Sequence, residues 1–200
     1  MYCLKIIIKF ATNIKLKKMT FDIIDKYGRI WAVRYDNQED NVLYTLFEQW
    51  HDVTWLYDFF EQNESDLNGH YKIPDIATAI KDTIDDCDKL ERMFLDIPAD
   101  VDVEMYFRPL ENFRTSEALL SKEKARPKRT KSHSSWLRIY AIKLEHGIFI
   151  ITGGAIKLTF TMQEREHTKD ELRKMEQVRN FLLEENIIDN DSFTEYVNTL

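Results

Sequence analysis

The chain has 200 residues, of which 44% are hydrophobic and 12% aromatic, enough apolar material for one compact core. No run approaches the roughly 18 apolar residues of a membrane span, because Lys5 and Lys9 flank the short apolar run 6–8. These lysines also argue against a signal peptide, and Cys3 and Cys87 show neither disulfide-framework nor metal-ligand spacing. We therefore expect a cytoplasmic globular protein with reduced thiols and no membrane association.

The net charge of −7 is unevenly distributed along the chain. Residues 39–105 carry 18 acidic and 4 basic side chains, a balance of −14, whereas residues 106–182 carry 9 acidic and 16 basic ones, a balance of +7. A bipolar chain of this kind can place a phosphate-binding patch on an acidic protein, although ordinary solvated faces produce the same statistic. Both interpretations stay open at this point.

The N-terminal region divides near Met19. Residues 1–18 are basic and weakly patterned, so we expect a disordered or mis-assigned extension, with Met1 and Met19 as alternative starts. A single domain is expected over residues 19–200. Within it, strand-forming runs before and after a turn that contains Gly28 predict a β-hairpin over residues 23–35.

Two long helices are predicted in the middle of the chain. After an N-cap at Asp40 or Asn41, apolar residues recur at three- and four-residue spacing as far as Phe60, with a kink near Asp52 as one option. A second helix begins at Pro74-Asp75 and keeps an apolar face to Phe94. We interpret its acidic face as solvated rather than as a metal site; it carries Asp82, Asp85, Asp86 and Asp88.

The segment from Ser121 to Ser135 has the composition of a loop, with many bases, one proline and no large apolar residue after Leu120. We expect this loop to bind RNA if the protein does. Its candidate RNA-binding residues are Lys122, Lys124, Arg126, Lys128, Arg129 and Lys131.

The last third predicts strands and a closing helix. Trp136 to Leu144 alternates as a strand, residues 145–147 form a turn, and residues 148–152 are apolar on both faces, as in a central strand. Gly153-Gly154 predicts a bulge before a further strand over residues 155–160. Thr168 and Glu171 then form a capping box for a helix that ends near residue 182, and residues 190–200 add a short helical turn.

These elements predict an α+β fold in which a small antiparallel sheet packs against two long middle helices and a closing C-terminal helix. Four motifs occur in a characteristic order. They are Arg108-Pro109-Leu110, residues 137–140 (Leu-Arg-Ile-Tyr), residues 150–154 ending in Gly153-Gly154, and Glu166-His167-Thr168 before Glu171-Leu172.

Over residues 106–183, the chain resembles the RelE/HigB type of toxin from bacterial toxin–antitoxin pairs. The resemblance implies a RelE-like fold and a ribosome-dependent endoribonuclease that cleaves messenger RNA without metal or cofactor. It also implies a partner antitoxin, of the helix-turn-helix type, that neutralises the enzyme.

Metal-independent RNA cleavage by the 2′-hydroxyl needs a base, a cation for the phosphorane charge and an acid for the leaving oxygen. In this interpretation, Arg138 and Arg165 clamp the phosphate, and Lys157 adds a point charge. His167 acts as acid or base, and Tyr140 stacks on a nucleobase.

Each of these residues also has a structural interpretation. The arginines can form salt bridges, Lys157 can be an ordinary strand lysine, His167 a helix-end residue and Tyr140 part of the core edge. Two further functions therefore stay open: a non-catalytic protein-binding module, favoured by Glu164 and Glu166 among the bases of the expected catalytic turn, and nucleic-acid binding without chemistry. A Gly-x-Ser-x-Gly elbow and a phosphate-binding loop are both absent from the sequence.

Overall fold

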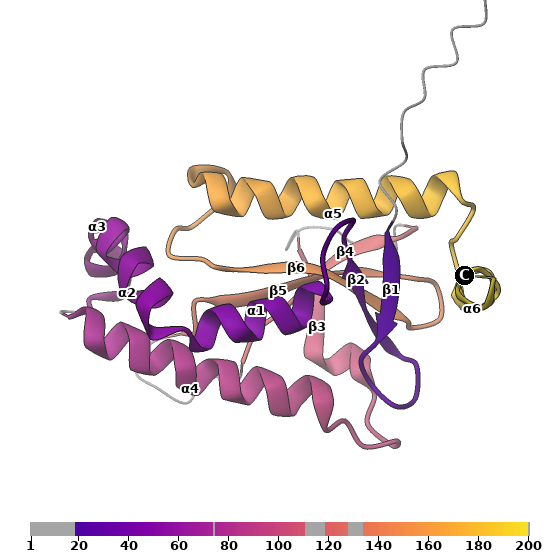
Figure 1. Ribbon diagram of the computed structural model, residues 1–200, viewed down its shortest axis with the longest axis horizontal. Helices are drawn as coiled ribbons and strands as arrows, with labels where there is room; N and C mark the ends of the chain where they lie inside the picture. Colours follow the sequence, from indigo (N-terminus) through magenta and orange to yellow (C-terminus); the bar gives the residue numbers. More distant parts are fainter. Residues whose placement is uncertain (1–18, 74, 111–118, 128–133, 200) are drawn as a thin grey trace, which may run out of the picture.

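The computed structural model describes residues 19–73, 75–110, 119–127 and 134–199, and the structural statements below refer to these residues. They form a six-stranded sheet with helices on both faces (Figure 1). The expected α+β class is confirmed. The expected extension at residues 1–18 and the candidate RNA-binding residues Lys128, Arg129 and Lys131 lie outside the described residues.

The strand order across the sheet is β1-β2-β6-β5-β4-β3. All neighbours are antiparallel except β2 and β6, so the expectation of a purely antiparallel sheet is wrong. A parallel pair needs a long connection, and the chain between β2 and β6 supplies one that contains the middle helices. The strands are β1 (Thr20–Ile23), β2 (Ile30–Arg34), β3 (Phe107–Pro109), β4 (Ser121–Ala125), β5 (Leu137–Lys143) and β6 (Phe149–Ile156).

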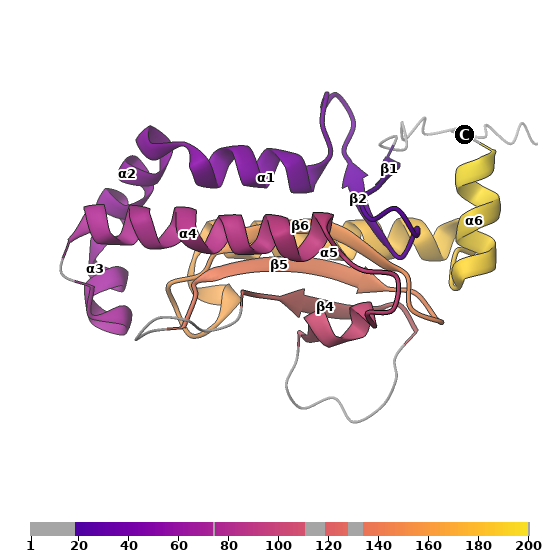
Figure 2. The same cartoon turned by 90° about the horizontal axis from the view of Figure 1, so that it is seen from below.

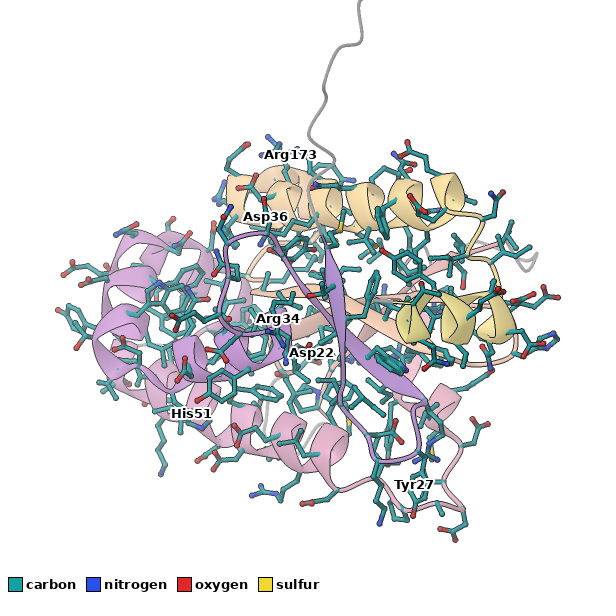
Figure 3. All side chains as sticks on the ribbon, turned by 45° about the vertical axis from the view of Figure 1, so that its right-hand side comes forward. Asp22, Tyr27, Arg34, Asp36, His51 and Arg173 are labelled. Atoms are coloured by element: carbon teal, nitrogen blue, oxygen red, sulfur yellow. The ribbon has the colours of Figure 1, made fainter. Side chains whose placement is uncertain are left out.

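The N-terminal hairpin is confirmed, and a buried carboxylate holds its turn. Asp25 accepts hydrogen bonds from the backbone N–H groups of Arg29 (2.6 Å) and Ile30 (2.9 Å) and from Arg29 Nε (2.9 Å). Beyond the turn, Arg34 forms an ion pair with Asp22 across the hairpin (Figure 3). The short β1–β2 pair therefore has side-chain support at both ends.

The first middle helix is divided at Asp52, as the kink option predicted. Asn41 caps α1 (Val42–His51) by accepting from the N–H groups of Leu43 and Tyr44, and Asp52 caps α2 (Val53–Gln62) in the same way. Each cap satisfies backbone donors that a helix start leaves unpaired. A short α3 (Glu64–Asp66) and a π-helical turn, η1 (Leu67–Tyr71), follow.

The second middle helix, α4 (Ile76–Leu95), is capped by Asp75 as predicted. Its acidic face is not uniformly solvated. Asp86 is 5% exposed and pairs with Lys89 at 2.8 Å, which compensates the cost of burying the carboxylate. A 3-10 turn, η2 (Val103–Tyr106), then leads into β3.

Two apolar layers sandwich the sheet. The helices α1, α2 and α4 cover one face, and α5 (Glu166–Glu184) covers the other, with α6 (Asn190–Asn198) beside the β1–β2 hairpin (Figures 1 and 2). All eight residues of β6 are buried, as expected for a central strand. No helix among the described residues has the length and apolar character needed to cross a membrane.

The glycine bulge in β6 is confirmed. Tyr140 pairs with Gly153 and Ala141 with Ile151, so Thr152 is the extra residue. The strand then ends at Ile156, and the separate strand expected over residues 155–160 is not formed.

The predicted capping box at Thr168 is wrong. Helix α5 begins at Glu166, and the hydroxyl of Thr168 donates to the carbonyls of Met162 (2.7 Å) and Arg165 (2.9 Å) from inside the first turn. The capping box of this region lies earlier: Thr161 precedes the 3-10 turn η3 (Met162–Glu164), and its backbone N–H donates to the Glu164 carboxylate. The sequence contains the Thr-x-x-Glu pattern twice, at residues 161–164 and 168–171, and in the folded chain the earlier one forms the capping box.

The interpretation of residues 121–135 as a loop is wrong for residues 121–125, which form β4. This strand pairs with β3 on one side and β5 on the other, so its backbone groups are satisfied whatever its side chains are. Glu123 and Ala125 are its buried residues, and its lysines lie on the opposite face. Because β4 lacks the alternation of apolar and polar residues that predicts a strand, its composition alone indicates a loop.

Candidate functional site

Cations from three neighbouring strands and from the end of β6 share one face of the sheet. Arg108 pairs with Lys124, and Lys124 pairs with Tyr140, so the three residues form one row across β3, β4 and β5. Residues directly opposite each other in an antiparallel pair point to the same face. This is the face on which α5 packs, over β5 and β6, because Tyr140 belongs to the apolar layer that includes Met175 and Val178.

A second row lies beside the first. Ala125, the last residue of β4, pairs with Ile139, so Arg126 follows it beside Arg138, on whose guanidinium its charge acts; Arg138 pairs in turn with Ala155 of β6. Lys157 follows Ala155 by two residues and so emerges on the same side. We name this surface the basic sheet face; its residues are Arg108, Lys124, Arg126, Arg138 and Lys157.

The cations of the basic sheet face act on one another electrostatically. Burial lowers the pKa of Lys124, and the charges of Arg138, Arg108 and Arg126 lower it further. Burial and then Arg138 lower the pKa of Lys157 in the same way, against the opposing charge of Glu164. Their protons are therefore held less tightly than those of ordinary lysines.

Arg138 is the most enclosed of the five cations. Its Nη1 donates to the carbonyls of Ser135 (2.6 Å) and Leu137 (2.7 Å), and burial lowers the pKa of the guanidinium. At the rim, the hydroxyl of Tyr71 donates to the carbonyl of Lys157 at 3.1 Å. Within the described residues, the side chains of Arg108 and Arg126 form neither a hydrogen bond nor an ion pair.

Tyr140 lies at the floor of the basic sheet face, with Glu171 of α5 nearby. Burial raises the pKa of the Tyr140 phenol, as does the nearby Glu171, whereas Arg138 lowers it. The Tyr140 hydroxyl and Glu171 Oε2 are buried without a hydrogen-bond partner among the described residues. Burial also raises the pKa of Glu171, although Lys174 and the Gly154 N–H oppose this shift. The Tyr140 phenol and the Glu171 carboxyl group therefore stay protonated to a higher pH than they do in water.

Arg165 and His167 lie apart from this cluster in their contacts. Arg165 forms a bidentate ion pair with Asp66 of α3, at 2.7 and 2.5 Å. His167 Nε2 lies 3.0 Å from the carbonyl of Ile156, and its ring packs edge-on against Phe59. Both residues thus connect the start of α5 to the rest of the fold, and their predicted roles in catalysis stay predictions.

The candidate RNA-binding residues are also divided. Lys124 and Arg126 lie on the basic sheet face, whereas Lys122 pairs with Glu176 of α5. Sequence reasoning did not include Arg108 among the site residues, although it quoted Arg108 in a motif. It missed Tyr71 altogether, because no sequence signal shows that η1 reaches the end of β6.

Comparisons of the chain with protein-family models, with curated proteins and with solved structures gave no match. The geometry of the basic sheet face and the motif resemblance are therefore the basis for a functional proposal.

Proposed function

We propose that the protein binds RNA on the basic sheet face and cleaves it without a metal ion, as a toxin of the RelE/HigB type. The observation that carries this proposal is the convergence of five cations on one half-buried sheet face. Their mutual repulsion is unfavourable in the free protein, and a polyanion that neutralises them recovers that energy.

The described side chains support specific roles in such a reaction. Arg126 and Arg138 carry planar guanidinium groups that suit two oxygens of one phosphate, so they would stabilise the phosphorane charge. Lys157, with its lowered pKa, would exchange a proton with the 2′-hydroxyl or the leaving oxygen more readily than an ordinary lysine. Both His167 and Lys157 contact backbone carbonyls, Lys157 Nζ those of Thr159 and Phe160, and the proposal assigns proton transfer to Lys157 because its pKa is lowered.

The proposed partners follow from the same surface. Messenger RNA on the ribosome would be the substrate, in the cytoplasm. An antitoxin of the helix-turn-helix type would neutralise the enzyme by covering the basic sheet face. Acidic residues on the antitoxin segment would serve this purpose, since they would compete with phosphate for the same cations.

Binding can be tested with a labelled single-stranded RNA of mixed sequence, by fluorescence anisotropy over a series of salt concentrations. Arg126→Gln and Lys157→Gln should each weaken binding and reduce the salt slope by about 0.7, the value for one phosphate contact on a single strand. The matched control is Arg173→Gln, which removes an exposed cation on α5 that pairs with Glu166. Figure 3 shows Arg173 on the outer side of α5. Equal effects in all three variants would contradict the proposed site.

Cleavage is tested separately with wild-type protein and ribosomes, using messenger RNA and a copy with 2′-deoxy residues. The proposal requires that the messenger RNA is cleaved in the presence of a chelator and that the 2′-deoxy copy is not. It also requires that Lys157→Gln loses cleavage activity. Binding without products would leave a nucleic-acid-binding protein without chemistry. Absence of both would favour the non-catalytic protein-binding module.

A further inference from the structure

A second group of polar residues lies on the opposite layer of the molecule, where the end of α1 meets α4. His51 is the last residue of α1, and Asp88 and Glu91 lie one turn apart on α4. One ligand atom from each of the three residues lies within 4.8 Å of the other two. Figure 3 shows His51 at the molecular surface, beside α4.

The imidazole of His51 is held in one orientation. Its Nδ1 lies 2.8 Å from the carbonyl oxygen of Phe47, which can only accept, so Nδ1 carries a proton. Nε2 then lies 2.8 Å from Oδ1 of Asp88. In the neutral ring, Nε2 presents a lone pair to a carboxylate, and two acceptors at this distance need a cation between or beside them. That cation is either a second proton on the ring or a metal ion.

Three features favour a metal ion as one occupant. A metal-bound histidine commonly donates its other ring N–H to a backbone carbonyl, as His51 does to Phe47. Glu91 supplies a third donor that the His51–Asp88 ion pair does not need. The side chains of His51 and Asp88 are 34% and 44% exposed, so an ion has access and water can complete its coordination.

The donor set also indicates the class of metal. Adjacent donors on a tetrahedral zinc ion lie about 3.3 Å apart, so His51 and Asp88 need to separate by only a few tenths of an ångström. One imidazole nitrogen with two carboxylates suits Zn²⁺ and related transition ions, whereas Mg²⁺ and Ca²⁺ prefer oxygen donors alone. Cys87 lies on the other side of the ring, with Sγ 3.7 Å from Nδ1, and is not in a position to act as a ligand.

We infer that His51 Nε2, Asp88 and Glu91 form a binding site for Zn²⁺ or a similar divalent transition ion, linking the end of α1 to the middle of α4. The site is independent of the proposed RNA chemistry, which uses the other face of the sheet and no metal. Its effect is on the folded state: an ion that binds the three residues only when α1 and α4 are packed together stabilises that packing.

The test uses the full chain at about pH 8, well above the unperturbed imidazole pKa of roughly 6.5, because burial lowers the pKa of His51 but its hydrogen bond to Asp88 and other contacts raise it overall. Isothermal calorimetry with ZnCl₂ should show saturable binding, and thermal unfolding should shift upward with added ZnCl₂ but not with MgCl₂. His51→Gln, Asp88→Asn and Glu91→Gln should each weaken zinc binding by about tenfold or more. Loss of a residue that only orients a metal ligand already has an effect of about this size. Glu61→Gln, on an exposed carboxylate of α2, is the matched control and should bind zinc as the wild type does.

Glu91→Gln is the decisive variant, because it leaves the His51–Asp88 pair intact. If Glu91→Gln binds zinc with the affinity of the wild type, Glu91 is not a ligand and the inference is overturned. It is also overturned if the wild type shows no saturable zinc binding, or if His51→Gln binds zinc with unchanged affinity. Circular dichroism of each variant without metal establishes that it is folded. RNA binding by the same variants should be unchanged, which separates this site from the proposed RNA function.

Discussion

The glycine bulge in β6 offers a quantitative test of how closely the two helical layers approach the sheet. A Cβ atom added at Gly154 would lie 2.7 Å from the backbone oxygen of Arg138 and 2.8 Å from Cδ1 of Leu46. A backbone oxygen in the centre of a sheet cannot rotate away, so either β5 or α1 must move. Overpacking of a core typically costs about 1–3 kcal/mol, and we expect Gly154→Ala to destabilise by about 3 kcal/mol.

Gly153 provides a graded comparison. A Cβ atom there would lie 1.8 Å from Oε2 of Glu171, which is the far end of a flexible side chain. The carboxyl group can move at the cost of its buried position, so we expect Gly153→Ala to destabilise by about 1–2 kcal/mol. Adding Glu171→Ala should recover part of that loss, because it removes the obstructing group.

Gly69 is the control, because a Cβ atom there would meet nothing within 4 Å. Gly69→Ala should be neutral or stabilising by about 0.4–1 kcal/mol, since alanine restricts the unfolded chain. Thermal and urea unfolding followed by circular dichroism would rank the three variants. For a chain of this size, each kcal/mol shifts the melting temperature by roughly 2–4 °C, so Gly154→Ala should melt about 6–12 °C below wild type. Equal melting temperatures for Gly154→Ala and Gly69→Ala would refute the close-approach argument.

Three further predictions concern buried polar groups. Because the folded state raises the pKa of Glu171 above the usual 4.5, the folded protein binds more protons than the unfolded chain between 4.5 and that raised pKa. Wild-type stability should therefore fall as pH rises through this window, whereas urea unfolding of Glu171→Gln should show a flatter pH profile; parallel profiles would contradict the assignment. Tyr140→Phe removes a buried hydroxyl with no partner among the described residues, so its melting temperature should equal or exceed that of wild type. Tyr35→Phe, which loses a 2.6 Å bond to a backbone carbonyl, should cost about 1 kcal/mol, and an equal loss in both variants would exclude this reasoning. Asp25→Ala leaves a buried backbone N–H unpaired in the hairpin turn and should destabilise by about 2 kcal/mol or more in urea; an unchanged midpoint would show that the turn does not need the carboxylate.

The sequence by itself determined the elements that depend on local hydrogen bonds and side-chain periodicity. Asn41, Asp52 and Asp75 cap helices at the positions where short polar side chains precede apolar spacing. The apolar run of β6 and its glycine bulge were also predictable, because a central strand is buried on both faces and a bulge needs small residues.

Only the tertiary structure decided which distant residues meet. Strand β4 has no apolar alternation, and its pairing with β3 and β5 made it a strand. The basic sheet face joins residues from four segments, and His51 meets Asp88 across 37 positions of the chain. Arg165 and His167, two of the residues predicted for the site, contact α3 and the end of β6. Strand register and helix packing determine these long-range contacts. The local sequence pattern of one segment does not indicate which distant segment it packs against.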